Sequence, residues 1–182
     1  MANDANCKFE FDGTPCRQPR HPYAHDDCRA TSDFPPQSTP DGAEIVEIAK
    51  EVLRIEAEGI SHLLDHVDQS FATAVQWIYA ASGRIIVTGI GKSGIVGRKI
   101  VATLSSTGTP ALFMHPVEAM HGDLGMVRRE DLILALSNSG ETDELNIIFP
   151  SLKNIGTRTI ALTGNLQSTL ARFSDLAIYT GV

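Results

Sequence analysis

The feature that most constrains the fold of this chain is a glycine-rich turn within residues 86–99, IVTGIGKSGIVGRK. An apolar run precedes the turn and an amphipathic segment follows it, so the order predicts a strand, a tight loop and a helix. Such a loop presents backbone N–H groups and a helix N-terminus to an anion. Gly91 lets the backbone approach a ligand, Lys92 adds a positive charge, and Ser93 can cap the helix or donate to an oxygen of the ligand. The turn therefore predicts a phosphate-binding site.

Two nucleotide-binding motifs share parts of this turn. A Walker A loop needs a four-residue spacer before its Gly-Lys pair, whereas one residue separates Gly89 from Gly91 here. The glycines do have the G-x-G-x-x-G spacing of a dinucleotide fingerprint, but a lysine and a serine stand inside the turn. A phosphorylated small molecule is therefore the better prediction for the ligand.

A second hydroxyl-rich turn lies within residues 131–144, DLILALSNSGETDE. Residues 132–136 form a continuous apolar run, as expected for a strand that is buried on both faces of a parallel sheet. The run ends in hydroxyl and amide side chains, which are Ser137, Asn138, Ser139 and Thr142. Together with backbone N–H groups, these side chains can donate hydrogen bonds to one phosphate without a fixed cation.

The second turn also has an ordinary structural explanation, because Ser139 and Thr142 belong to the residue types that cap helices. For a single turn that explanation would be preferred. Two such turns, each at the carboxyl end of an apolar strand, favour a ligand instead, because open parallel sheets bind ligands at those strand ends.

Further apolar runs alternate with helical segments along the rest of the chain. The runs at residues 111–114, 159–162 and 176–179 are typical of short strands. With the two strands that precede the turns, they predict a five-stranded parallel sheet. The expected fold class is therefore α/β, a three-layer αβα sandwich preceded by two helices.

The helices before the sheet are predicted from apolar spacing. Apolar residues recur at i, i+3, i+4 and i+7 within residues 45–67, so we expect one long amphipathic helix there. Ser70 is the candidate cap of a second helix, which we expect to end near Gly83.

Charge and composition exclude several classes of function. The net charge of −7, with basic residues scattered along the chain, argues against a nucleic-acid surface. No apolar run is long enough to span a bilayer, and residues 1–20 lack the apolar core of a signal peptide. We therefore expect a cytoplasmic protein that binds neither nucleic acid nor membrane. On such an acidic chain, Lys92 is the cation that would attract an anionic ligand.

Residues 1–40 differ in composition from the rest of the chain. They contain all three cysteines and several prolines, and they show no apolar periodicity. This pattern predicts a disordered or loosely attached extension, followed by one folded domain at residues 41–182.

Two groups of residues could hold a metal ion, but neither has a complete ligand set. His62 and His66 lie one turn apart on the first predicted helix without a visible third ligand, so a solvated or subunit-facing pair is the preferred interpretation. The candidate ligands before residue 41 match no common zinc module, and they are Cys7, Cys16, His21, His25 and Cys28. We therefore expect no metal and no cofactor.

The combination of motifs resembles one known family. The run GIGKSGIVGRKIVATLSSTGTP, the later HPVEAMHGDLG, and LSNSGETDE followed by LTGN closely resemble the sugar isomerase (SIS) domain of bacterial arabinose-5-phosphate isomerases. The resemblance covers about residues 43–182. It implies a reversible conversion of D-ribulose 5-phosphate to D-arabinose 5-phosphate, which feeds synthesis of the Kdo sugar of lipopolysaccharide or capsule.

The resemblance also implies site residues. Lys92 matches the active-site lysine of the family, His121 the histidine of the HGDLG motif, and Glu144 the catalytic glutamate after the serine-rich turn. Isomerisation through an enediol needs such acid–base groups, and a histidine is easily poised near neutral pH. The residues implied to bind the substrate phosphate are Gly91, Ser93, Ser137, Asn138, Ser139 and Thr142.

The resemblance implies a homo-oligomer, a tetramer, because the first helices of the family pack against partner subunits. Family members continue past the last strand with a further glutamate, a histidine near a His-Pro-Gly-Gly turn and often a tandem CBS pair. This sequence ends at Val182, so we expect its SIS domain to be C-terminally incomplete.

Two other functions stay open from the sequence. One is a phosphosugar-binding regulatory SIS module without turnover, which would keep the phosphate turns and dispense with the catalytic base. The other is a nucleotide-binding protein. It is disfavoured because Met114 and His115 stand at the end of the second strand, where an acidic ribose-binding residue is expected.

Overall fold

Short apolar runs form the strands of one sheet in the computed structural model, which describes residues 41–181. The strands are β1 (Ile85–Gly89), β2 (Ala111–Met114), β3 (Leu132–Leu136), β4 (Arg158–Thr163) and β5 (Leu176–Tyr179). They are arranged in the order β2-β1-β3-β4-β5, and every neighbouring pair is parallel. This arrangement confirms the predicted five-stranded parallel sheet. The extension expected at residues 1–40 lies outside the described residues.

The centre of the sheet is the pairing of β1 with β3. Their register places Ile85 beside Leu132 and Gly89 beside Leu136, so the two strands end side by side. All residues of both strands are buried. Burial on both faces explains why these strands appear in the sequence as continuous apolar runs rather than as alternating ones.

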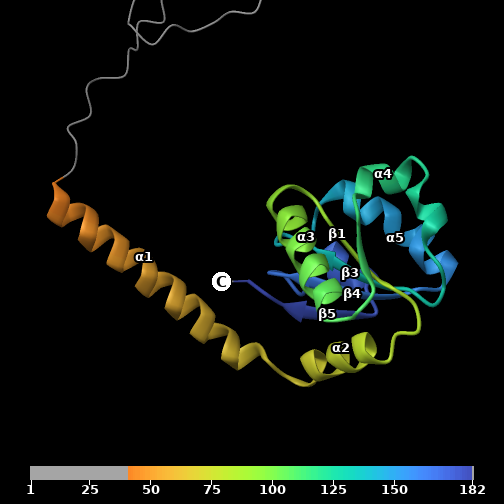
Figure 1. Ribbon diagram of the computed structural model, residues 1–182, viewed down its shortest axis with the longest axis horizontal. Coiled ribbons are helices and arrows are strands. Elements are labelled where there is room, and N and C mark those ends of the chain that lie inside the picture. The colour runs from red at the N-terminus through yellow and green to blue at the C-terminus, as the bar shows by residue number, and fades with distance from the viewer. Residues whose placement is uncertain (1–40, 182) are drawn as a thin grey trace, which may run out of the picture. The chain divides into compact units, whose positions relative to one another are not determined.

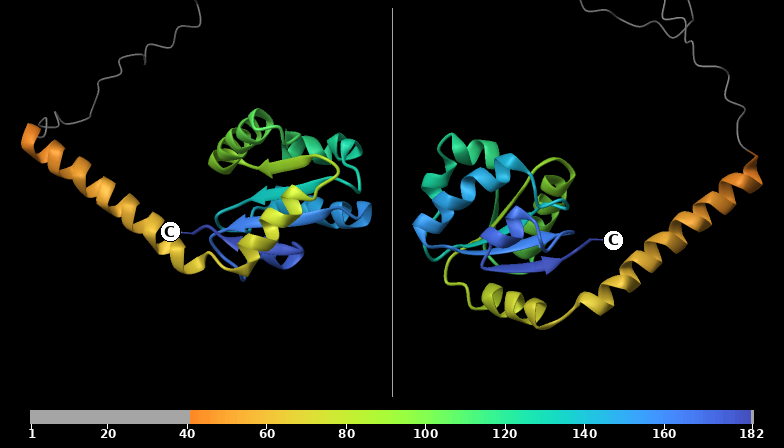
Figure 2. Two further views of the ribbon diagram at one scale, coloured as in Figure 1. Left: turned by 60° about the horizontal axis from the view of Figure 1, so that its bottom comes forward. Right: turned by 180° about the vertical axis from the view of Figure 1, so that it is seen from behind.

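Helices α2 to α6 cover the two faces of the sheet and give three layers, whereas α1 extends away from the sheet (Figures 1 and 2). The helices of the described chain are α1 (Gly42–His62), α2 (Gln69–Tyr79), α3 (Gly91–Ser106), α4 (Pro116–Met120), α5 (Asp143–Ile155) and α6 (Thr169–Phe173), with 3₁₀ turns η1 (Leu63–His66) and η2 (Asp123–Met126). On one face, side chains of α2 and α3 pack against Ile85, Val87 and Leu134. On the other face, side chains of α4, α5 and α6 pack around Ile86 and Ile133.

The segment before the sheet differs in two details from the expectation. The predicted long helix stops at His62, where the chain tightens into η1, and α1 buries none of its residues. The predicted cap Ser70 is also wrong: the carboxylate of Asp68 accepts a hydrogen bond from the Ser70 N–H at 2.8 Å and caps α2, which ends at Tyr79. An aspartate one residue before the helix competes better for this position because its side-chain oxygen reaches the free N–H groups of the first turn.

No helix within residues 41–181 is long and apolar enough to cross a bilayer.

Candidate functional site

The order of the strands identifies one edge of the sheet as the natural ligand site. From β1 the chain continues into α3 on one face of the sheet, and from β3 it continues into α5 on the other face. Because β1 and β3 are neighbours, the two connecting loops diverge at the same point of the carboxyl edge. Open α/β sheets with this strand order bind ligands in the crevice at such a switch point.

The two helices that start at this point lack a side-chain cap. Neither Ile90, which precedes α3, nor Thr142, which precedes α5, makes a side-chain hydrogen bond to the first turn of its helix. By contrast, Asp68, His115 and Ser168 cap α2, α4 and α6. The free N–H groups and the positive dipole ends of α3 and α5 are therefore available to an anion. The expectation that Ser93 caps α3 is wrong, since Ser93 is already the third residue of that helix.

The loop between β3 and α5, residues 137–142, is stabilised by hydrogen bonds to its own hydroxyl groups. The Ser137 and Thr142 hydroxyl oxygens are 2.8 Å apart, and Ser137 Oγ also accepts the Gly140 N–H at 3.1 Å. Ser139 Oγ accepts the Glu141 N–H at 3.2 Å. Within the described chain, the Ser139 N–H makes no hydrogen bond. The loop thus holds hydroxyls and at least one free N–H together, as the phosphate prediction requires.

A cavity of about 290 Å³ brings the two turns together. Lys92 and Ser93 line it from α3, and Ser137 and Asn138 line it from the end of β3. The rest of its lining is apolar except for Thr180, and it consists of Val96, Ile100, Leu136, Leu162 and Thr180. Four predicted phosphate-site and catalytic residues from two distant parts of the sequence therefore share one cavity. Gly91, with a φ of +58°, begins α3 beside it.

Lys92 provides the positive charge of this cavity. It lies in the first turn of α3 with an exposed side chain. Among residues 41–181 it forms no ion pair, unlike Lys50, Arg54 and Arg84. An unpaired lysine next to a helix N-terminus adds to the attraction that the helix dipole exerts on an anion.

The two other predicted catalytic residues do not line the cavity. His121 ends α4 and Glu144 lies in the first turn of α5, and both are exposed. In the part of the chain that the structure describes, no hydrogen bond or ion pair joins His121 or Glu144 to Lys92. The structure thus brings Lys92 to the same cavity as residues of both hydroxyl-rich turns. The catalytic roles of His121 and Glu144 remain predictions.

Sequence reasoning missed the residues that hold the 137–142 loop from outside. The Asn146 side chain, on α5, donates to the Gly140 carbonyl oxygen at 3.3 Å. The Gly164 N–H donates to the Asn138 carbonyl oxygen at 2.9 Å, and the Thr163 hydroxyl donates to the same oxygen at 3.3 Å. The contacts of Gly164 and Thr163 had no recognisable signal in the sequence, because they depend on the ends of β3 and β4 lying side by side.

The candidate metal ligands stay incomplete. His62 and His66 approach each other, with 3.2 Å between their Nε2 atoms, and the His66 ring also packs on Tyr179. Within residues 41–181, no three ligating side chains form a cluster that could hold a metal ion. The cysteines and histidines before residue 41 lie outside the described residues.

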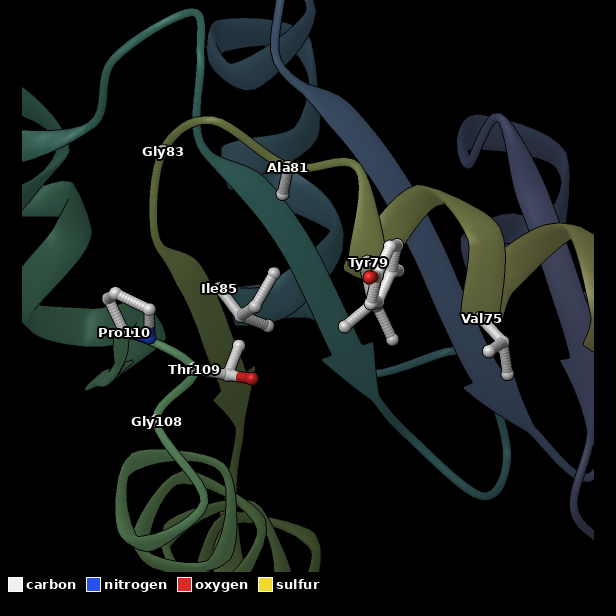
Figure 3. A pocket seen from close by; sticks show the side chains of 9 residues that line it. Val75, Tyr79, Ala81, Gly83, Ile85, Gly108, Thr109 and Pro110 are labelled. Carbon is white, nitrogen blue, oxygen red and sulfur yellow. The ribbon is translucent and has the colours of Figure 1, made fainter.

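A second cavity, of about 380 Å³, lies at the opposite end of the strands. It is lined by residues that lead into β1 and β2, such as Gly83 and Thr109, and by the end of α2 (Figure 3). Its walls are mostly apolar, and none of the predicted site residues reaches it. The predicted site residues that share a cavity therefore lie at the carboxyl edge of the sheet.

The chain is similar in sequence to known proteins. A family model described as SIS domain matches residues 78–182. The probable arabinose 5-phosphate isomerase of Haemophilus influenzae is 46% identical over 133 residues, which are 73% of this chain and 40% of that protein. Arabinose 5-phosphate isomerase KdsD of Escherichia coli K12 is 44% identical over 135 residues, which are 74% of this chain and 41% of that protein.

Solved structures share the fold as well. The structure described as E. coli CFT073 c3406 in complex with A5P has a TM-score of 0.75 and 37% sequence identity, and the match covers 79% of this chain and 76% of that chain. The present chain spans about two fifths of the length of the curated relatives that it matches. The matched region contains the whole five-stranded sheet and both turns of the site. The chain therefore belongs to the SIS domain family.

Proposed function

We propose that this chain carries the sugar-phosphate site of an aldose–ketose isomerase that interconverts D-ribulose 5-phosphate and D-arabinose 5-phosphate for Kdo synthesis. The observation that carries the proposal is one cavity that is lined by the unpaired Lys92 in the first turn of α3 and by Ser137 and Asn138 from the loop that leads into α5. Neither α3 nor α5 has a side-chain cap. The names of the relatives and the A5P bound to a structural neighbour support the choice of substrate.

In this proposal the phosphate lies between the two turns. The N–H groups of α3 from Gly91 and the hydroxyl of Ser93 bind it from one side, with the ammonium group of Lys92 beside it. The loop at residues 137–142 binds it from the other side through Ser137, Asn138, Ser139 and Thr142. A phosphate dianion suits this arrangement, because it accepts several hydrogen bonds and is attracted by both helix dipoles.

The reaction itself moves one hydrogen between C1 and C2 of the sugar and one between the two oxygens. Substrate and product contain the same atoms, so the isomerisation consumes no electron acceptor. We assign the carbon-bound proton to the carboxylate of Glu144 and the oxygen-bound proton to the imidazole of His121. General acid–base groups of this kind typically contribute about 10²- to 10⁴-fold to the rate.

The proposal includes a cytoplasmic homotetramer. Helix α1 supports the assembly, because it buries none of its residues and yet exposes a row of large apolar side chains, which are Ile45, Val46, Ile48, Val52, Leu53, Ile55 and Ile60. Contiguous apolar surface of this kind typically marks an interface between proteins.

An isomerase assay with parallel binding measurements tests the proposal. The chain is mixed with D-ribulose 5-phosphate, the formation of D-arabinose 5-phosphate is followed, and calorimetry compares D-arabinose 5-phosphate with unphosphorylated D-arabinose. We expect turnover and a clear preference for the phosphorylated sugar. Binding without turnover would favour the regulatory SIS module, and equal binding of both sugars would contradict the phosphate site.

A further inference from the structure

The start of α6 is tied to the 137–142 loop by hydrogen bonds that come from outside the helix. The Thr169 N–H donates to the Glu141 carboxylate at 2.8 Å, and the Leu170 N–H donates to the Gly140 carbonyl oxygen at 3.0 Å. Ser168 caps the next N–H group, that of Ala171, at 3.3 Å. The first three N–H groups of α6 would otherwise have no partner, and the loop supplies two of the three acceptors.

Glu141 links the start of α6 to Ser139 within the 137–142 loop. Its side chain binds α6, while its own N–H donates to Ser139 Oγ at 3.2 Å. Next to it, Gly140 has a φ of +67°, and a Cβ atom there would collide with the side chain of Ser168. The loop and the beginning of α6 are therefore closely packed, and Glu141 contacts both of them, α6 through its side chain and Ser139 through its backbone N–H.

The charge on Glu141 favours the same contact. The hydrogen bonds from Thr169 hold the pKa of the Glu141 carboxyl below its ordinary value, and the nearby Arg172 acts in the same direction. Glu141 does not line the cavity at the switch point. Its carboxylate is thus engaged with the protein rather than with the ligand.

We propose that Glu141 is a positioning residue for phosphate binding: by capping α6 it holds Ser139 and the free N–H groups of the loop in the geometry that a phosphate monoester needs. The helix whose first turn the Glu141 carboxylate caps is α6 rather than α5, which follows Glu141 directly in the sequence. The proposal rests on the proposed function, because it assigns the loop to the phosphate of the sugar.

Two substitutions remove the same hydrogen bond from its two ends. Glu141→Ala deletes the acceptor. Thr169→Pro deletes the donor, together with the Thr169 hydroxyl that accepts from Arg172 at 3.3 Å, and changes no residue of the loop. Proline is well tolerated at the first position of a helix. Ser168 has φ −68° and ψ 164°, the extended conformation that the residue before a proline prefers. Both variants should therefore fold, and Glu141→Gln keeps an acceptor oxygen as the conservative control.

The experiment compares the affinities of each variant for D-arabinose 5-phosphate and for unphosphorylated D-arabinose by calorimetry. We expect both Glu141→Ala and Thr169→Pro to weaken binding of the phosphorylated sugar about tenfold, with unphosphorylated sugar unaffected. The double variant should lose no more than either single one, because both changes remove one interaction. Glu141→Gln should retain most of the affinity. In turnover, KM should rise while kcat is kept.

Asp143 provides the matched control, since it is an exposed acidic residue two positions away whose side chain makes no hydrogen bond in the described chain. Asp143→Ala should bind both sugars as the unmodified chain does. If Glu141→Ala lowers the melting temperature but leaves the affinity for the phosphorylated sugar unchanged, Glu141 is only a helix cap and the inference is overturned. If the unmodified chain binds neither sugar, the proposed function fails first and the inference fails with it.

Discussion

Arg84 and Asp131 join the amino-terminal ends of β1 and β3 through a bidentate ion pair. The Arg84 Nη2 atom lies 2.7 Å from Asp131 Oδ2, and the Arg84 Nε and backbone N–H both donate to Oδ1, at 3.2 and 2.8 Å. The Arg128 N–H completes the set at 2.9 Å. Because β1 and β3 carry the two turns of the site at their other ends, this pair fixes the alignment of the strands that position the site.

Asp131→Asn should lower the free energy of unfolding by about 2 kcal/mol, because a buried acceptor of several hydrogen bonds loses its charge. The Arg84 side chain is 35% exposed, so water compensates part of the loss. Urea denaturation measures the effect. Glu130→Gln, which changes an exposed neighbour, is the control and should leave stability within about 0.5 kcal/mol. An equal effect of both variants would show that the ion pair contributes nothing specific.

The same pair sets a pH dependence. Burial alone would raise the pKa of Asp131, but the hydrogen bonds and charge of Arg84, with the Arg128 N–H, outweigh it and hold the pKa below its ordinary value of 3.8. A carboxyl group with a lowered folded-state pKa stabilises the protein above its unfolded pKa and loses that contribution as the pH falls through the folded value. The stability difference between the unmodified chain and Asp131→Asn should therefore be constant above about pH 5 and shrink below about pH 4.

Lys92→Ala should weaken binding of D-arabinose 5-phosphate about ten- to a hundredfold, because it removes a charge-assisted contact worth about 1.5 to 3 kcal/mol. Calorimetry measures the affinity. Lys99→Ala changes an exposed lysine on the same helix that does not line the cavity, so it should bind nearly as the unmodified chain does. Equal losses in the two variants would point to general charge attraction rather than to a contact with phosphate.

Gly140→Ala should destabilise the fold by at least about 2 kcal/mol, because a side chain would have to adopt a positive φ and push Ser168 away. For a chain of this size such a loss lowers the melting temperature by roughly 4 to 8 °C. Gly125→Ala is the control, since nothing lies within 4 Å of its added Cβ. A normal melting temperature for Gly140→Ala would mean that the loop and α6 can separate at little cost.

Glu144→Gln and His121→Asn should each reduce kcat by about 10²-fold or more while changing the affinity for D-arabinose 5-phosphate little. Steady-state isomerase kinetics and calorimetry separate the two effects. The control is Glu118→Gln, which changes an exposed glutamate on α4 and should leave kcat unchanged. If kcat of either catalytic variant is normal, its assigned role is wrong.

Ile48→Asp combined with Val52→Asp should break the proposed assembly, because both side chains are about half exposed on α1 and would bring charge into an apolar interface. Light scattering coupled to size-exclusion chromatography gives the mass. Glu51→Gln, on the same helix, should leave the mass of the assembly unchanged. A monomeric unmodified chain at micromolar concentration would contradict the proposal.

The sequence predicted the sheet more accurately than the helices around it. Residues 132–136 were predicted as a buried strand from their continuous apolar run, and β3 has those bounds. Burial on both faces of a sheet favours such a run. Helix ends depend on short-range competition between possible caps. Asp68 rather than Ser70 caps α2. The apolar spacing continues beyond His62 and therefore does not predict that α1 ends there.

The site was predictable where it depends on local sequence. The turns that contain Lys92 and Ser137 were identified from their glycines and hydroxyls, and the strand order then brings them to one cavity. The supports of the loop were not predictable, because the bond between Glu141 and Thr169 joins residues 28 positions apart. Contacts of this range become visible only once the strands are placed.

The absence of side-chain caps on α3 and α5 has a consequence for the protein without ligand. Helix caps typically contribute about 1 kcal/mol each, so α3 and α5 are less stable without a ligand than they would be with a cap. A bound phosphate would act as the shared missing cap of both. Stability and occupancy are then coupled, and the amount of folded protein should rise with the concentration of its sugar phosphate in the surrounding solution. Under the proposed function, the sugar phosphate would stabilise the fold in addition to serving as the substrate.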